Sequence, residues 1–91
     1  MKVEFLPSWD RSYAQLADAE RKRCVRALDA MMGYFEGGVR PVGLGLKRLR
    51  GPYWEARSGL RLRILFELGK DLIRFILVGD HEAIRRFLRR V

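Results

Sequence analysis

The segment from Arg61 to Leu68, RLRILFEL, constrains the fold of this chain more than any other part. Apolar residues recur at every second position from Leu62 onward, and the side chains of a strand point alternately to the two faces of a sheet. The pattern therefore predicts a strand with one buried face, and it places Arg61 and Arg63 together on the other. A register shift of one residue would bury both arginines, so the register is well specified. Guanidinium groups on a sheet face favour a phosphate-bearing ligand.

Glycine, proline and hydrophobic periodicity divide the rest of the chain into short elements. Apolar stripes at helical spacing predict a first helix that ends near Ala17 and a second over about 18–36. A Gly/Pro loop over 37–46 leads into a basic turn, and an amphipathic helix is expected over 81–91. The expected strands are residues 2–6, 53–57, 61–68 and 72–78.

These elements predict a single α+β domain over residues 1–91. Strands joined by such short turns are antiparallel, so we expect an antiparallel sheet of about four strands in the order β-α-α-β-β-β-α. The two N-terminal helices would cover one face and the short C-terminal helix would follow the last strand. The other face would be left open and would carry Arg61 and Arg63.

The charge of the chain is unevenly distributed. Its formal net charge is +8. Residues 1–46 contain seven basic and six acidic residues, whereas residues 47–91 contain twelve basic and five acidic ones. A field of one sign over half the molecule favours nucleic acid, an acidic protein or an anionic membrane as partner. The alternative is charge that serves solubility alone, which would not need to be segregated.

Cysteine content and hydropathy limit the other functional classes. Cys24 is the only cysteine, so no disulfide within the chain and no cysteine metal cluster can form. No apolar run approaches the roughly 20 residues that span a bilayer, and the first residues do not resemble a signal peptide. We expect a cytoplasmic protein with no metal, no cofactor and no membrane association.

Three stretches of the chain resemble one protein family. Residues 46–55, LKRLRGPYWE, resemble its turn-and-strand motif LK-x-L-x-G-x-[YW]. Residues 62–68, LRILFEL, resemble the following arginine-bearing strand, and residues 76–81, ILVGDH, resemble the end of its last strand. In this order and spacing they are similar to the RelE/ParE superfamily of toxins from bacterial type II toxin–antitoxin systems, and the resemblance covers essentially the whole chain.

The resemblance implies one of two activities. Members of the RelE and YoeB branch cleave mRNA at the ribosome, and members of the ParE branch inhibit DNA gyrase without hydrolysis. Both are neutralised by a cognate antitoxin protein. We expect a ribosome-dependent, metal-independent mRNA endonuclease. A ParE-like gyrase inhibitor and a non-catalytic basic nucleic-acid-binding module remain alternatives.

The resemblance assigns roles to three residues. Arg63 falls on the strand arginine that contacts the scissile phosphate, and His81 falls where the nuclease branch carries a histidine or arginine. Lys47 falls on a basic residue that resembles ribosomal-RNA contacts. Four positions depart from the family pattern: Trp54 and Ala56 stand where RelE has lysines, Leu44 where a YoeB-like glutamate base would lie, and Arg85 where many members have a tyrosine.

The residue chemistry agrees with this assignment and leaves alternatives open. Guanidinium groups stabilise a phosphorane, and His81 is the only histidine, the side chain that titrates near neutrality. We take Arg63, His81 and Arg61 as catalytic, with Glu55 and Glu67 as weaker candidates for the base. The arginines could instead pair with these glutamates across the hairpin, and His81 could simply begin a helix. The residues expected to bind nucleic acid are Lys47, Arg48, Arg50, Arg57 and Arg85, although Arg85 could belong to a solvated helix face.

Overall fold

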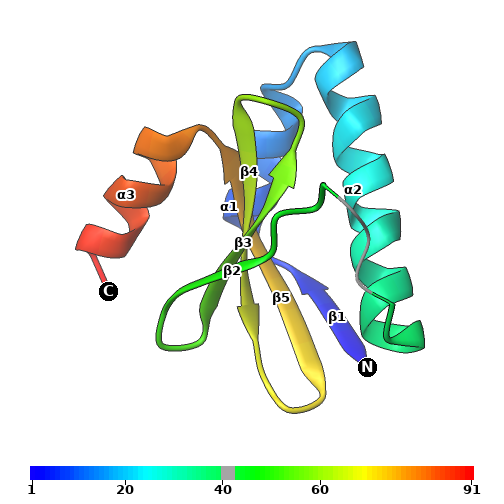
Figure 1. Ribbon diagram of the computed structural model, residues 1–91. Helices are drawn as coiled ribbons and strands as arrows, with labels where there is room; N and C mark the ends of the chain where they lie inside the picture. The colour runs from blue at the N-terminus through cyan, green and yellow to red at the C-terminus, as the bar shows by residue number, and fades with distance from the viewer. Residues whose placement is uncertain (40–42) are drawn as a thin grey trace.

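The structure is a computed structural model that describes residues 1–39 and 43–91. In these residues a five-stranded sheet is flanked by three helices (Figure 1). The strands lie in the order β1-β5-β4-β3-β2 across the sheet. Along the chain, the elements are β1 (Lys2–Phe5), α1 (Pro7–Ala14), α2 (Asp18–Gly37), β2 (Lys47–Arg50), β3 (Tyr53–Ser58), β4 (Leu62–Leu68), β5 (Leu72–Gly79) and α3 (His81–Arg89).

The α+β fold class and the element order expected from the sequence are confirmed, with two corrections to the sheet. Residues 47–50 form an edge strand, β2, where a basic turn was expected, so the sheet has five strands. In addition, β1 pairs with β5 in parallel, so the sheet is mixed and not antiparallel. A short turn forces an antiparallel pair only between consecutive strands, and β1 and β5 are separated by most of the chain.

The first helix is shorter than expected because an arginine from α2 caps it. It ends at Ala14, before the expected Ala17. The guanidinium of Arg21 donates hydrogen bonds to the carbonyl oxygens of Ala14, at 2.7 Å, and Tyr13, at 3.4 Å. The Tyr13 carbonyl also accepts a hydrogen bond from the amide of Leu16 at 3.1 Å. A cation at a helix C-terminus interacts favourably with the helix dipole.

Helices cover both faces of the sheet, but unequally. The main core lies between the sheet and the pair α1 and α2, and Phe66, Phe75 and Met31 are its largest buried side chains. A smaller core of Leu65, Ile76 and Ile84 lies beneath α3 on the opposite face. Figure 1 shows α3 on the side of the sheet away from α2. The second face is therefore open only where α3 does not reach, which corrects the expectation of an uncovered layer.

The strand β5 contains a bulge that adds an apolar residue to the surface against which α3 packs. Phe75 pairs with Phe66 and Leu77 pairs with Leu65, so Ile76 has no partner on β4. Ile76 and Leu77 both join the small core beneath α3, although they are consecutive in sequence. An extra residue of this kind disrupts the ladder locally and increases the twist of the strand.

Two serines of α1 form hydrogen bonds with the backbone of β5 beyond the end of β1. The last β1 pair is between Phe5 and Phe75. Past this point the Ser8 hydroxyl donates to the carbonyl of Ile76 at 2.5 Å, and the amide of Val78 donates to the Ser12 hydroxyl at 3.0 Å. The helix thus satisfies backbone groups that an exposed sheet edge would offer to another chain.

The buried thiol of Cys24 predicts a loss of stability in alkali. Burial raises the pKa of this thiol to about 11, and the neighbouring Ser58 hydroxyl opposes the rise. Because the pKa in the unfolded chain lies near the model-peptide value, the folded protein holds a proton that the unfolded chain releases as the pH rises above about 8.5–9. This contribution to stability is present below that pH and is lost as the pH rises through the pKa of Cys24 in the folded protein. We expect the free energy of unfolding, measured in urea, to fall by about 3 kcal/mol between the unfolded-state and folded-state pKa values, and we expect Cys24→Ala to lack this fall. If the free energy of unfolding depended on pH in the same way in both proteins, the prediction would be wrong.

In the described part of the chain, no helix has both the length and the apolar character that crossing a membrane requires.

Candidate functional site

The centre of the candidate site is a largely buried ion pair between Arg63 of β4 and Glu55 of β3. Arg63 Nε lies 3.6 Å from Glu55 Oε2, and the two side chains are 18% and 11% exposed. The guanidinium of Arg63 also donates to the carbonyl oxygens of Leu60, at 3.5 Å, and Leu62, at 3.3 Å. Alternation in β4 places Arg63 on the same face as Leu65, which is the face that carries α3. The pair therefore lies beside α3 on the partly open face.

Two further basic residues stand opposite this pair in the sheet. Lys47 of β2 pairs with Glu55, and Arg57 of β3 pairs with Arg63. Both side chains are exposed, and neither forms an ion pair within the residues that the structure describes. The Arg57 side chain lies against Gly45, where an added Cβ would come within 2.9 Å of its Nε. A positive surface thus surrounds one buried carboxylate.

The end of β5 brings His81 to the same region. Gly79 pairs with Arg63, and His81 follows two residues later as the first residue of α3. Its side chain is exposed. Asp80 is the N-cap of α3, and its carboxylate accepts a hydrogen bond from the amide of Ala83 at 2.9 Å. The carboxylate of Asp80 is thus engaged with the helix.

Helical spacing places Arg85 beside His81. Residues four apart lie on one side of a helix, so these two side chains share a flank of α3. The other flank carries Ala83, Arg86 and Arg90, which line a pocket with Ser8 of α1. His81 and Arg85 therefore lie on the flank of α3 that faces away from this pocket.

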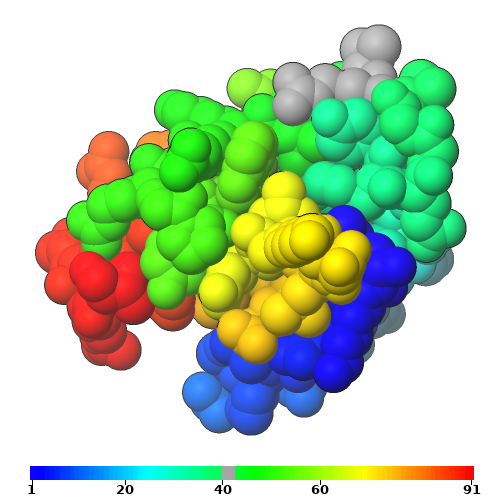
Figure 2. Space-filling view, turned by 90° about the horizontal axis from the view of Figure 1, so that it is seen from below, coloured from blue at the N-terminus to red at the C-terminus, as the bar shows by residue number. Residues whose placement is uncertain are grey.

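Arg48 and Arg50, the other basic residues of β2, are engaged with backbone carbonyls. Arg48 Nε donates to the carbonyl of Gly51 at 3.0 Å, across the turn that follows. Arg50 donates to the carbonyl of Leu88 and, at 2.9 Å, to that of Val91. Figure 2 shows the red C-terminal end of α3 beside the green segment that contains β2. The Arg50 guanidinium thus serves as a C-terminal cap of α3.

This contact predicts that Arg50 holds the end of α3. Replacing Arg50 with glutamine should remove a charged hydrogen bond worth about 1 kcal/mol at an exposed position. We expect amide hydrogen exchange of residues 87–91 to accelerate severalfold, while β4 and β5 stay protected. The matched control is Arg86→Gln on the same helix, which caps no carbonyl in the described structure. Equal exchange in the two variants would refute the capping role.

Arg61 does not lie beside Arg63. The strand begins at Leu62, so Arg61 belongs to the turn after β3, where strand alternation does not apply. Its side chain lines a pocket with Glu20 and Arg23 of α2. The structure thus places the two arginines that the sequence expected on one face in different surroundings. The catalytic role predicted for Arg61 stays a prediction without support from this placement.

The two residues that stand where RelE has lysines do not face the candidate site. Trp54 and Ala56 belong to the main core, so their side chains face α1 and α2. The β3 side chains on the site face are instead Glu55 and Arg57. Sequence reasoning ranked Glu55 below His81 as a candidate base, and its alternation with Arg57 was the signal that would have placed it in the site.

The other candidate carboxylate, Glu67, lies in a separate ion-pair ladder. Arg74 Nη1 lies 3.1 Å from Glu67 Oε1, and Arg74 Nε lies 2.9 Å from Glu4 Oε2. Hydrogen bonds to Glu4 and then to Glu67 raise the pKa of Arg74. This ladder joins β1, β5 and β4, so Glu67 is committed to the sheet. Among the described residues, no group of three or more His, Cys, Asp or Glu side chains could hold a metal ion.

Solved structures of bacterial and archaeal toxins have the same fold. YafQ from Escherichia coli matches with a TM-score of 0.64 and 17% identity, over 91% of this chain and 96% of that one. The RelB–RelE antitoxin–toxin complex from Methanococcus jannaschii matches with a TM-score of 0.69 and 20% identity, over 92% and 96%. A YoeB/ParE toxin from Agrobacterium tumefaciens matches with a TM-score of 0.65 and 21% identity, over 89% and 99%. No protein-family model and no curated protein sequence matches the chain. The RelE-like fold expected from the sequence is therefore confirmed.

Proposed function

We propose that this protein is the toxin of a type II toxin–antitoxin system and that it cleaves mRNA on the ribosome. The observation that carries the proposal is the arrangement of Arg63, which Glu55 holds on a basic face beside the strand end that presents His81. The fold shared with YafQ, RelE and a YoeB/ParE toxin supports the same class. A ribosome-directed toxin would act in the cytoplasm.

The proposed chemistry is attack of an RNA 2′-oxygen on the adjacent phosphorus. The bond from phosphorus to the 5′-oxygen breaks, and the leaving oxygen takes a proton from solvent water, which leaves a 2′,3′-cyclic phosphate and a 5′-hydroxyl. Arg63 donates hydrogen bonds to the phosphorane oxygens as their charge develops. His81 accepts the 2′-hydroxyl proton, because an imidazole titrates near neutral pH. Lys47, Arg57 and Arg85 contact flanking phosphates.

Glu55 acts in this proposal as a positioning residue for Arg63. Replacing it with glutamine should lower the cleavage rate about tenfold, because the guanidinium loses its ionic partner. Glu55→Asp should restore part of the rate. The matched control is Glu67→Gln, which removes a carboxylate from β4 at a position outside the site. A rate unchanged in Glu55→Gln, measured in a purified translation system with a reporter mRNA, would remove Glu55 from the mechanism.

Inhibition of DNA gyrase is the second candidate function. It is favoured by one observation: Trp54 and Ala56, which stand where RelE has lysines, belong to the core, and Ala56 is completely buried. A surface that lacks these lysines could bind a protein target without cleaving RNA. This candidate predicts loss of supercoiling activity with intact mRNA.

Inducible expression distinguishes the two candidates. We expect translation arrest with new 5′ ends in a reporter mRNA, mapped by primer extension, while purified gyrase keeps its supercoiling activity. His81→Ala, an exposed substitution, should relieve the arrest without loss of the fold. Growth arrest with intact mRNA and inhibited gyrase would overturn the nuclease proposal in favour of the second.

A cognate antitoxin is the expected protein partner. The RelE structure from M. jannaschii is a complex with the antitoxin RelB. The net charge of +8 favours an acidic or amphipathic segment as the inhibitor. Such a segment would neutralise the site by covering Arg63 and its basic neighbours.

A further inference from the structure

The outer edges of the sheet carry backbone groups with which another chain could pair. They belong to β1 and β2, the outermost strands. At the β1 edge, the amides of Lys2 and Leu6 donate to carbonyl groups in and next to β5, at 2.8 and 3.0 Å. Successive residues of a strand direct their backbone groups to opposite edges, so those of Val3 and Phe5 point away from β5. No other segment within residues 1–39 and 43–91 forms a hydrogen bond with these outward groups.

The same edge exposes a row of apolar side chains. Met1, Val3 and Phe5 alternate along this segment, and they are 53%, 38% and 47% exposed. The ring of Phe5 stacks on that of Phe75 with a centroid distance of 5.0 Å, so the row borders the main core. Figure 2 shows the blue N-terminal segment at the margin of the molecule, beside the yellow turn between β4 and β5. The β1 edge thus combines open backbone groups with an apolar surface that water reaches.

The charges of β1 select one register for pairing with a second copy. A two-fold axis perpendicular to the sheet makes the two strands antiparallel and keeps each face on its own side. Residues that stand opposite each other are then both even or both odd in number. Pairing centred on Val3 places Lys2 of each copy opposite Glu4 of the other. Pairing centred on Lys2 or on Glu4 places like charges opposite each other, which is unfavourable.

The register centred on Val3 also satisfies the open backbone groups. The amide of Val3 in each copy would donate to the carbonyl of Val3 in the other, and the amide of Phe5 would donate to the carbonyl of Met1. Pairs of residues that exchange both bonds in this way are the hydrogen-bonded pairs of an antiparallel ladder. Their formation would bring the two apolar rows side by side. Charge, hydrogen bonding and apolar contact therefore agree on one arrangement.

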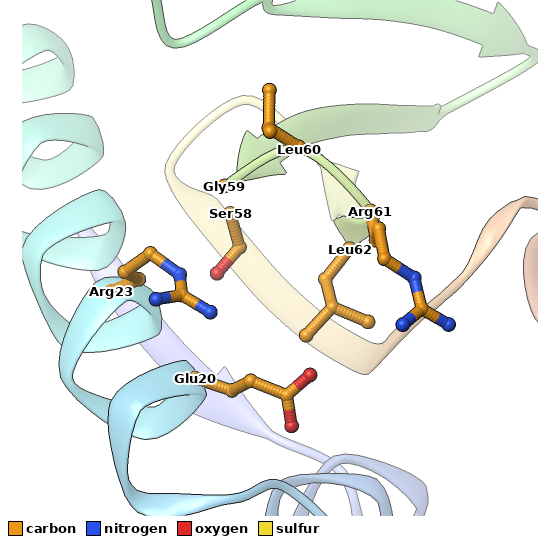
Figure 3. Close-up of a pocket in the computed structure, with 7 residues that line it drawn as sticks. All are labelled: Glu20, Arg23, Ser58, Gly59, Leu60, Arg61 and Leu62. Carbon is orange, nitrogen blue, oxygen red and sulfur yellow. The ribbon is translucent and has the colours of Figure 1, made fainter.

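Two other exposed surfaces do not match a second copy in this way. The β2 edge carries Lys47, Arg48 and Arg50, so two such edges would bring like charges together. The turn after β3 exposes Leu60, which points away from the neighbouring pocket in Figure 3, and Arg61 follows it. One apolar residue beside a cation is not complementary to itself. The β1 edge is the one of these three surfaces that is self-complementary.

We propose that two copies of this protein pair through β1 and form a symmetric dimer. The pairing is antiparallel, is centred on Val3 and joins the two sheets into one continuous sheet. The rotation axis keeps the two α3 helices on the same face of that sheet. β1 pairs with the first half of β5, whereas Arg63 pairs with Gly79 at the other end. The interface therefore does not include the candidate site.

The dimer should be weak because a single pair of strands makes a small interface. Specific stable interfaces bury about 1,200–2,000 Å², and this pairing involves only the first residues of each copy. We expect a dissociation constant on the order of 100 µM. The apolar row and the backbone hydrogen bonds provide the affinity, and the pairs of Lys2 with Glu4 fix the register.

Sedimentation equilibrium of the full chain, from about 10 µM to about 1 mM, tests the dimer. We expect the mean mass to rise from that of a monomer toward that of a dimer. Amide hydrogen exchange of Val3 and Phe5 should slow severalfold over the same range, while the amides of Lys2 and Glu4, which face β5, should not change. A monomer mass at every concentration would overturn the proposal. A dimer in which Val3 and Phe5 exchange at the monomer rate would place the interface elsewhere and would also overturn it.

Charge reversal tests the register. Lys2→Glu and Glu4→Lys should each weaken self-association about tenfold, because like charges then stand opposite each other. An equimolar mixture of the two variants should associate at least as tightly as the unsubstituted protein, since each pair again joins opposite charges. The control Lys22→Glu makes the same change of charge at an exposed position of α2 and should keep the affinity within about twofold.

The mixture also controls for folding. Glu4 forms an ion pair with Arg74, so Glu4→Lys changes more than the interface, and recovery of association in the mixture would show that this variant is folded. Self-association of Lys2→Glu at the affinity of the unsubstituted protein would refute the register. A mixture that associates no more tightly than either variant alone would refute it as well.

The cognate antitoxin is the alternative occupant of this edge. If the protein alone stayed monomeric and the bound antitoxin protected the amides of Val3 and Phe5, the edge would be an antitoxin site and the dimer would be wrong. None of these measurements involves RNA or the ribosome. Their outcome is therefore independent of the proposed nuclease.

Discussion

Cleavage of a reporter mRNA is expected to fall about 100-fold when Arg63 is replaced by lysine. The guanidinium offers several donors in a fixed plane that match a phosphate, whereas an ammonium is a point charge on a flexible chain. The lysine keeps a positive charge near Glu55, so the buried carboxylate is not left unpaired. The rate of appearance of new 5′ ends in a purified translation system measures the effect.

Two comparisons make this result specific to catalysis. Arg11→Lys changes an exposed arginine of α1, away from the site, and should leave the cleavage rate unaltered. Thermal unfolding should show that Arg63→Lys remains folded at the assay temperature. Cleavage by Arg63→Lys at the rate of the unsubstituted protein would exclude the guanidinium from the reaction.

The largest effect on stability is expected from Phe66→Ala. Phe66 is completely buried on β4, and its ring centroid lies 6.1 Å from those of both Phe35 and Phe75. Truncation of a buried phenylalanine costs about 3–5 kcal/mol, the sum of lost burial and the cavity that remains. A domain of this size has a free energy of unfolding of about 5–15 kcal/mol, so the variant should lose a large part of its stability.

Urea unfolding measures this loss, and Leu60→Ala is the control. Leu60 is 98% exposed at the tip of the neighbouring turn, so its truncation should change the free energy of unfolding by less than about 0.5 kcal/mol. Phe66→Leu should show an intermediate loss, because more of the volume is kept. Similar midpoints for the two alanine variants would mean that Phe66 does not anchor the core.

Periodicity predicted the helices and the central strands because their burial is one-sided or complete. The stripe of α2 and the alternation of β4 both appear in the sequence, and the core follows them. The edge strand β2 could not be found this way, since Lys47, Arg48 and Arg50 leave it one apolar residue in four. Its strand conformation depends on pairing with β3, which is a tertiary interaction. The parallel position of β1 likewise depends on contacts distant in sequence.

The candidate site was predictable in part, and the errors have physical causes. The face of Arg63 followed from alternation, and the place of His81 followed from the end of β5. Arg61 was assigned to the same face because the strand was started one residue early, and alternation fails in a turn. The engagement of Arg50 with α3 joins residues that are distant in the chain, so no local pattern could indicate it.

The unpaired residue of β5 bears on how the chain tolerates changes of length. Because the pairs on both sides of Ile76 keep their partners, removal of this residue alone would restore a regular ladder without turning any later side chain to the opposite face. Gly79 would still stand across from Arg63, and α3 would still leave the sheet on the same side. What would be lost is one apolar contact beneath that helix. Chains of this fold can therefore be one residue shorter here and retain the same arrangement of reactive groups.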